Sequence, residues 1–189
     1  EHSSDGWVDS ADDETFGAWT PMASLALTTP PPWLDSTPID HLVGYFTYAR
    51  GFKGGGFNAV LNPQAGASLD AFDPEYLDSF ELGAKARAFD NRVAFNAAVF
   101  LGLWDDQQVQ AFETVGVGPD GVPQTRNLTL NAAEATIRGV EVEVVAVPWP
   151  ELRVEGSLGL PDTEYDDFER AVSFLDGSEI DRSGESFAE

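Results

Sequence analysis

The sequence lacks several residue types on which functional sites are commonly built. It has no cysteine, which excludes disulfide scaffolds, cysteine-type zinc sites, cysteine-ligated iron–sulfur clusters and thiol catalysis. Its two histidines, His2 and His41, stand in no recognisable haem or zinc motif. Basic residues are also few, since 10 Lys and Arg face 33 Asp and Glu for a formal net charge of −23. A surface of that charge repels phosphate, so we expect no nucleic-acid partner.

Long hydrophobic runs are absent as well. No stretch approaches the ~18 consecutive apolar residues that a membrane helix needs, whereas each strand of a membrane barrel needs only about 9 to 11 residues of alternating character. The hydrophobic content of 42% is too high for a disordered acidic tail. Because the chain begins at Glu1 and its single methionine is Met22, we expect a section or a processed product of a longer protein.

Alternation with a period of two is the main structural signal. Its clearest case covers residues 79–88, where apolar and polar or charged side chains alternate. A tight turn at residues 90–91 joins this segment to a second strand at residues 93–103. The other segments predicted to be strands are residues 19–28, 42–52, 140–146 and 152–160. The pattern predicts an all-β, antiparallel fold of about six strands without a convincing helix.

The predicted connections are of two kinds that alternate along the chain. Short turns at residues 90–91 and 148–151 alternate with long segments rich in Gly, Pro or acidic residues at 53–74, 113–126 and 161 onward. The long segments should therefore all emerge at one end of the sheet. Short turns on one rim and long loops on the other are typical of an outer-membrane barrel.

Periodicity alone does not separate a lipid-facing barrel from a soluble sandwich, in which the apolar residues would face a core. The length of the strands and the charges of both signs on one face favour the barrel. Aromatic residues near strand ends suit the interfacial girdles of a barrel; they are Phe89, Trp104, Trp149 and Tyr165. A soluble acidic all-β module remains the alternative.

The charged face supplies the candidate functional residues. Alternate carboxylates such as Glu141 and Glu143 suit the lining of a polar lumen better than catalysis, because no nucleophile with a base and an orienting group appears. Lys85, Arg87 and Arg153 are expected to neutralise these carboxylates. The full set of candidate lumen-facing residues is Glu81, Lys85, Arg87, Glu141, Glu143, Arg153 and Glu155.

Two further patterns allow a ligand-binding interpretation, but a structural one is preferred for each. Residues 51–57 are rich in glycine, yet no G-K-[ST] element or helix follows, so we expect a bend where glycine supplies backbone angles that other residues avoid. Acidic clusters at residues 12–14 and 162–167 lack the spacing of an EF-hand and are expected to be solvated loops. We expect no metal and no cofactor.

Three motifs stand in order along the chain. Residues 45–58 form an aromatic segment that leads into R-G-F-K-x-G-G-F-N, and residues 73–85 fit P-E-x-x-x-S-Y-E-L-G-x-K, with Phe80 in place of Tyr. Residues 131–143 fit N-A-x-x-A-x-x-x-G-V-E-x-E. In this order the motifs resemble the barrel of TonB-dependent outer-membrane receptors, especially the siderophore-type branch. Residues 96–110 also resemble the strand that the family has between the last two motifs.

The resemblance covers roughly residues 16–187 and implies a section of a 22-stranded barrel with a plug. About six of these strands lie in residues 1–189, which would be a partial barrel domain without the plug. The implied function is uptake of a scarce ligand, a ferric siderophore, with energy from the TonB complex delivered through the missing plug region. Outer-membrane lipid would be a further partner. The resemblance implies no enzymatic activity, and a non-functional receptor fragment remains an alternative.

Overall fold

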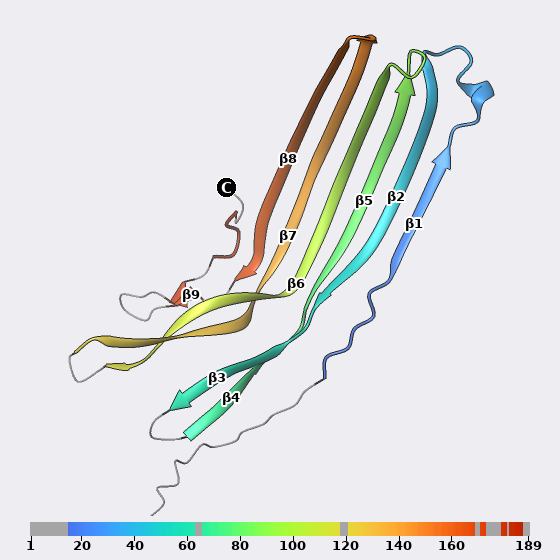
Figure 1. The fold of residues 1–189 in the computed structure, drawn as a ribbon. Coiled ribbons are helices and arrows are strands. Elements are labelled where there is room, and N and C mark those ends of the chain that lie inside the picture. The colour runs from blue at the N-terminus through green and yellow to red at the C-terminus, as the bar shows by residue number, and fades with distance from the viewer. Residues whose placement is uncertain are drawn as a thin grey trace, which may run out of the picture.

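The computed structural model describes residues 15–62, 66–117, 121–168, 171–172, 179–180 and 182–186. Six antiparallel strands form one sheet in the order β1-β2-β5-β6-β7-β8. The strands are β1 (Met22–Thr28), β2 (Ile39–Lys53), β5 (Glu75–Ala88), β6 (Val93–Val117), β7 (Pro123–Trp149) and β8 (Leu152–Phe168). They lie side by side in a single layer with β1 and β8 at its two edges (Figure 1). The predicted all-β, antiparallel fold is confirmed.

The remaining described elements are short. One two-stranded sheet pairs β3 (Gly56–Asn62) with β4 (Gly66–Phe72), and another pairs β9 (Ala171–Val172) with β10 (Glu179–Ile180). A single 3₁₀ turn, η1 (Pro31–Trp33), precedes β2. Among the described residues, no helix is long and apolar enough to cross a membrane.

Two predicted long loops are largely strand. Residues 53–74 contain β3 and β4, and most of residues 113–126 belongs to β6 and β7, which pair as far as Val117 and Pro123. The alternation that marks the sheet is absent from these segments because they leave its plane. In Figure 1 the outer parts of β6 and β7, residues 107–117 and 123–133, turn away from the line of the sheet. We call this part the outer hairpin.

The connections lie as the alternation predicts. The turns at residues 89–92 and 150–151 lie at one end, which we call the short-turn end, and β3, β4 and the outer hairpin lie at the other, the long-loop end (Figure 1). Phe89, Asp90 and Asn91 all have positive φ, between 57° and 60°. Asp and Asn tolerate this left-handed conformation better than most residues, which is why a tight turn forms at this point.

The pairing register sorts the side chains of the sheet onto two faces. Directly paired residues share a face, and neighbours along a strand alternate between faces. One face, which we call the apolar face, carries large exposed hydrophobic side chains on all six strands: Leu25, Leu27, Phe46, Leu82, Phe95, Val99, Leu101, Leu103, Val140, Val144, Leu152, Val154, Leu158 and Leu160. The opposite face is called the charged face.

A conventional core is missing from the described part of the chain. No large side chain there is fully buried. Leu34 is buried near the short-turn end, whereas the other buried residues gather at or near the long-loop end: Asn58, Glu75, Leu128, Ala133, Ala135, Thr163 and Phe168. Within the described residues, no second layer therefore packs against either face of the sheet, although its apolar face exposes many residues that would be costly to leave in water.

The glycine-rich segment between β2 and β3 is shaped by a close approach. A Cβ on Gly55 would collide with the backbone oxygen of Phe72 and lie 2.8 Å from the ring of Phe16, whereas a Cβ on the adjacent Gly54 would meet nothing within 4 Å. Neither glycine has the positive φ that the sequence led us to expect. Space, and not the backbone angle, is what requires glycine at position 55.

We predict that Gly55→Ala opens the β3–β4 pair and that Gly54→Ala does not. The clash at Gly55 involves backbone and should cost about 1–3 kcal/mol, as overpacking does, whereas alanine at Gly54 should be neutral or stabilise by about 0.4–1 kcal/mol. The rate of chymotrypsin cleavage at Phe57 and Phe72 in the folded protein reports the open population. Equal cleavage rates in the two variants would contradict this account.

Candidate functional site

All seven residues predicted to line a lumen lie on the charged face. The register places Lys85 in one row with Asn96 and Glu143, and it places Arg87 in the row that ends at Glu155. Glu81, Glu141 and Arg153 alternate with apolar-face residues in the same way. The structure therefore brings the predicted residues together on one side of β5, β7 and β8.

The expected neutralisation of the carboxylates is realised only in part. Arg153 forms an ion pair with Glu155 on the same strand. Among the described residues, neither Lys85 nor Arg87 forms an ion pair, so that expectation was wrong for both. Lys85 is separated from Glu143 by a whole strand, or about 9.6 Å at the usual strand spacing.

Other partners take the place of those ion pairs. The Lys85 ammonium lies 5.2 Å from the centre of the Tyr45 ring, a cation–π contact. The Asn96 amide donates a hydrogen bond of 2.9 Å to Glu143. Glu81 and Glu141 border the same shallow groove, of about 450 Å³, as these residues. The charged face thus offers an acidic, partly unneutralised surface.

Two motif glycines on the charged face lie opposite aromatic side chains. Gly83 lies directly opposite Tyr45, and Gly139 directly opposite Phe100. A Cβ on either glycine would collide with the ring opposite it. Each ring therefore lies flat over a neighbouring strand, which explains the glycine in both the E-L-G and the G-V-E motif.

Four aromatic residues were predicted to form an interfacial girdle, and the structure agrees with this position for only two of them. Phe89 and Trp149 are 58% and 56% exposed at the short-turn end. Trp104 and Tyr165 share a row with Leu77 and Ala135 on the charged face, so their assignment to a lipid-facing girdle was wrong.

Sequence reasoning missed the aromatic cluster at the long-loop end of the apolar face. Tyr48 contacts Phe80 with ring centres 5.1 Å apart, and Phe52 contacts Tyr76 at 5.5 Å. The Arg50 guanidinium lies 4.6 Å from the centre of the Tyr76 ring. The aromatic run of residues 45–48 was visible in the sequence, but the face that each ring occupies depends on the register.

The apolar face has the height of a lipid core. On β6 it runs from Val93 to Leu103, which is roughly 34 Å along a strand at about 3.4 Å per residue. A tilt of about 35–45° reduces this to about 24–28 Å, close to the apolar band of about 25 Å that outer-membrane barrels present.

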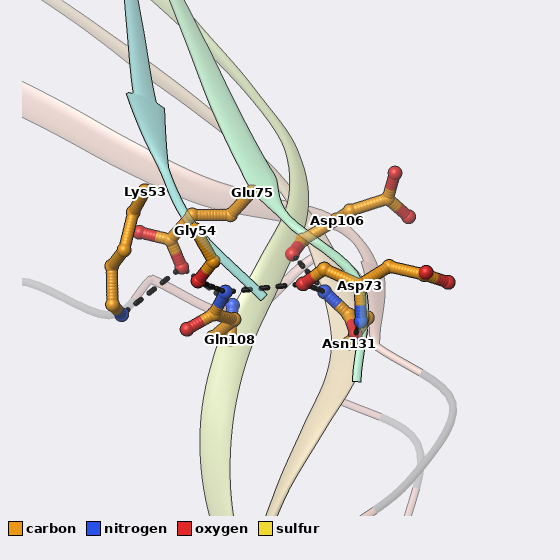
Figure 2. Close-up of polar contacts among 7 residues, drawn as sticks. All are labelled: Lys53, Gly54, Asp73, Glu75, Asp106, Gln108 and Asn131. Carbon is orange, nitrogen blue, oxygen red and sulfur yellow. Dashed lines mark hydrogen bonds and ion pairs between the residues drawn. The ribbon is translucent and has the colours of Figure 1, made fainter. Parts of the chain in front are cut away.

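Polar contacts replace the apolar band at the long-loop end. Figure 2 shows Gln108 donating from its side chain to the backbone oxygens of Gly54 and Asp73, at 2.9 and 3.1 Å. Its backbone N–H donates to Glu75 at 2.7 Å, and Lys53 contacts the same carboxylate at 3.4 Å. These residues join the ends of β2, β4, β5 and β6.

The acidic cluster at residues 162–167 belongs to β8 and not to the solvated loop that the sequence led us to expect, and it shows no metal site. Within the part of the chain that the structure describes, no group of three or more His, Asp or Glu could hold a metal ion. Arg138 forms ion pairs with Asp162 and Glu164, at 2.7 and 3.9 Å, and Thr136 donates to Asp166 at 2.6 Å. The cluster at residues 12–14 lies outside the described residues.

The comparison with family models decides what this sheet is. Residues 1–186 match the model described as TonB dependent receptor-like, beta-barrel. The chain belongs to the TonB-dependent receptor family. It is therefore a segment of an outer-membrane receptor barrel and not of an enzyme. The alternative of a soluble acidic module is excluded, and the exposed apolar face is explained by lipid.

A solved structure supports the same fold. The chain is similar to a chain in a structure titled "Structure of the RagAB peptide transporter", with a TM-score of 0.60 and 12% sequence identity. The similarity covers 89% of this chain and 21% of that chain. At this identity the similarity establishes the fold alone. No curated protein sequence matches the chain.

We predict that a charge on the apolar face destabilises the receptor far more than the same charge one residue away. Val99→Arg places a cation near the middle of the lipid-facing band and should cost about 2–4 kcal/mol. Ala98→Arg, the matched control, points to the charged face directly opposite Glu141 and should cost much less. Guanidinium unfolding of the whole receptor in lipid vesicles measures both. Similar losses in the two variants would refute the assignment of faces.

Proposed function

We propose that this chain forms part of the wall of a receptor that takes up a ferric siderophore. The observation that carries the proposal is the set of siderophore-type motifs at residues 45–58, 73–85 and 131–143. The family membership supplies the transporter class, and the motifs supply the branch. Energy would come from the TonB complex through a plug region.

The charged face is proposed to line the lumen. Its seven candidate residues, Glu81, Lys85, Arg87, Glu141, Glu143, Arg153 and Glu155, could not face hydrocarbon without a large desolvation cost. The opposite face carries the large exposed hydrophobic side chains that lipid would cover. The assignment is supported by this contrast between faces and by the shared register of the seven residues.

The long-loop end is proposed to face the outside of the cell. Outer-membrane barrels have short periplasmic turns and longer extracellular loops. In this orientation β3, β4 and the outer hairpin would meet the ligand first, and Phe89 and Trp149 would lie at the periplasmic interface. The carboxylates of the charged face would line the path inward.

The lumen assignment predicts which introduced cysteines react with a water-soluble reagent. The chain has no cysteine of its own, so single substitutions at Ser157 and Leu158 give a matched pair on opposite faces. Ser157→Cys should react with a small charged thiol reagent in the whole receptor, and Leu158→Cys should react with a lipid-soluble maleimide instead. The reverse pattern of labelling would overturn the assignment.

The ligand class is tested by binding to the purified whole receptor. We expect a panel of ferric siderophores to include one that quenches tryptophan fluorescence with a Kd of about 1 μM or below, a free energy near −8 kcal/mol. The iron-free forms and short peptides serve as controls. Binding of peptides with no response to any ferric siderophore would replace this proposal with peptide uptake.

A further inference from the structure

The β3–β4 pair continues the β2–β5 pair beyond the main sheet. The two pairs share one register, which is interrupted at residues 54–55 and 73–74, and β3 and β4 pair only with each other among the described residues. A two-stranded hairpin without further strands is at best marginally stable in water. Side-chain contacts to the neighbouring outer hairpin therefore help to fix its position.

Asn58 on β3 provides the first of these contacts. Its amide nitrogen donates to the backbone oxygen of Thr129 on β7 at 2.7 Å, and its amide oxygen accepts from the backbone N–H of Thr129 at 2.8 Å. The Asn58 residue is 9% exposed. The side-chain amide thus bonds to Thr129 as a neighbouring strand would, through one donor and one acceptor.

Asn131 on β7 makes the same kind of contact in the opposite direction. Its amide oxygen accepts from the backbone N–H of Asp73 at 2.6 Å, and its amide nitrogen donates to the backbone oxygen of Asp73 at 2.8 Å (Figure 2). One asparagine reaches from the β3–β4 pair to β7, and the other reaches back from β7 to the residue that follows β4.

Asn131 also stabilises the bend of the outer hairpin. The β6–β7 register shifts between Trp104 and Gln108, and Asp106 within this bulge has a φ of 54°. A bulge leaves backbone groups outside the ladder. The Asn131 amide donates to the backbone oxygen of Asp106 at 2.8 Å (Figure 2). One side chain therefore bonds both to a backbone oxygen within the bulge and to Asp73.

We infer that Asn58 and Asn131 are positioning residues that lock the β3–β4 pair to the outer hairpin, so that both meet the ligand as one rigid surface. A side-chain amide carries both the donor and the acceptor that this pairing uses, on two atoms of one planar group. Gln108 closes the base of the same junction through its bonds to Gly54 and Asp73. The role in ligand capture rests on the proposed function, whereas the lock itself is independent of any ligand.

The lock is tested by spin labels on the whole receptor in detergent micelles, without ligand. Labels at the exposed positions Ala71 and Val117 should give a narrow distance distribution in the parent protein. Asn58→Ala combined with Asn131→Ala should broaden the distribution about twofold or more, because a hairpin held by few contacts opens readily. Asn127→Ala, on an exposed residue of the same strand, should leave it unchanged.

Hydrogen exchange measured by mass spectrometry identifies which contact each asparagine makes. Asn58→Ala should speed exchange of the Thr129 amide about tenfold, and Asn131→Ala should do so for the Asp73 amide, since each loses a hydrogen bond. Should an alanine variant misfold, Asn58→Asp and Asn131→Asp keep the acceptor and remove the donor. These variants should still broaden the distance distribution.

Unchanged distances and unchanged exchange in folded variants would overturn the lock. That result would leave the ferric siderophore assay unaffected, and a receptor that binds no siderophore could still show the lock. The two proposals therefore fail separately.

Discussion

The structure depends on its backbone hydrogen-bond ladder, because the described sheet is one layer with no core. A soluble sheet buries its apolar face against another layer, whereas here Leu82, Val99 and Leu158 remain largely exposed. In lipid that exposure carries no penalty, but an unpaired backbone group does. The outer strands β1 and β8 each pair with only one other strand of the sheet among the described residues, although residues 182–185 bond to the far edge of β8 at Tyr165 and Phe168. Membership of a closed barrel resolves both problems at once, since lipid covers one face and further strands satisfy the edges.

The part of the fold that the sequence predicts best is the part governed by this ladder. Alternation from Val93 to Leu103 identifies both the strand and its lipid-facing side, because a strand in a single layer has two unlike environments and a period of two. The same parity would have placed Trp104 on the charged face. Its assignment to a girdle relied on its position at a predicted strand end, which says nothing about the face. All seven candidate residues fall on one face because each was chosen by parity.

The sequence is much less informative beyond the main part of the sheet. The outer hairpin keeps its backbone pairing, but it leaves the sheet and loses the two environments that produce alternation, so its strands read as loops. The contacts of Asn58 and Asn131 join residues 71 and 58 positions apart, and no local pattern predicts such partners. The sequence also could not predict that Lys85 and Arg87 form no ion pair with carboxylates of the described residues. Their cross-strand neighbours can be identified only once the register is known.

The chain therefore combines two modes of stabilisation, one in the wall and one in the β3–β4 pair. The wall is held by continuous backbone ladders between its strands, with its apolar face covered by lipid. The β3–β4 pair is held by a few side-chain amides and by the space that Gly55 leaves for Phe72. Elements held by few contacts lie at the low-stability end of a structure, so the lock formed by Asn58 and Asn131 decides whether the β3–β4 pair and the outer hairpin act as one rigid surface. Asn58, Asn131 and Gly55 thus belong to the junction between the wall and the rim, whereas Gly83 and Gly139 belong to the wall itself.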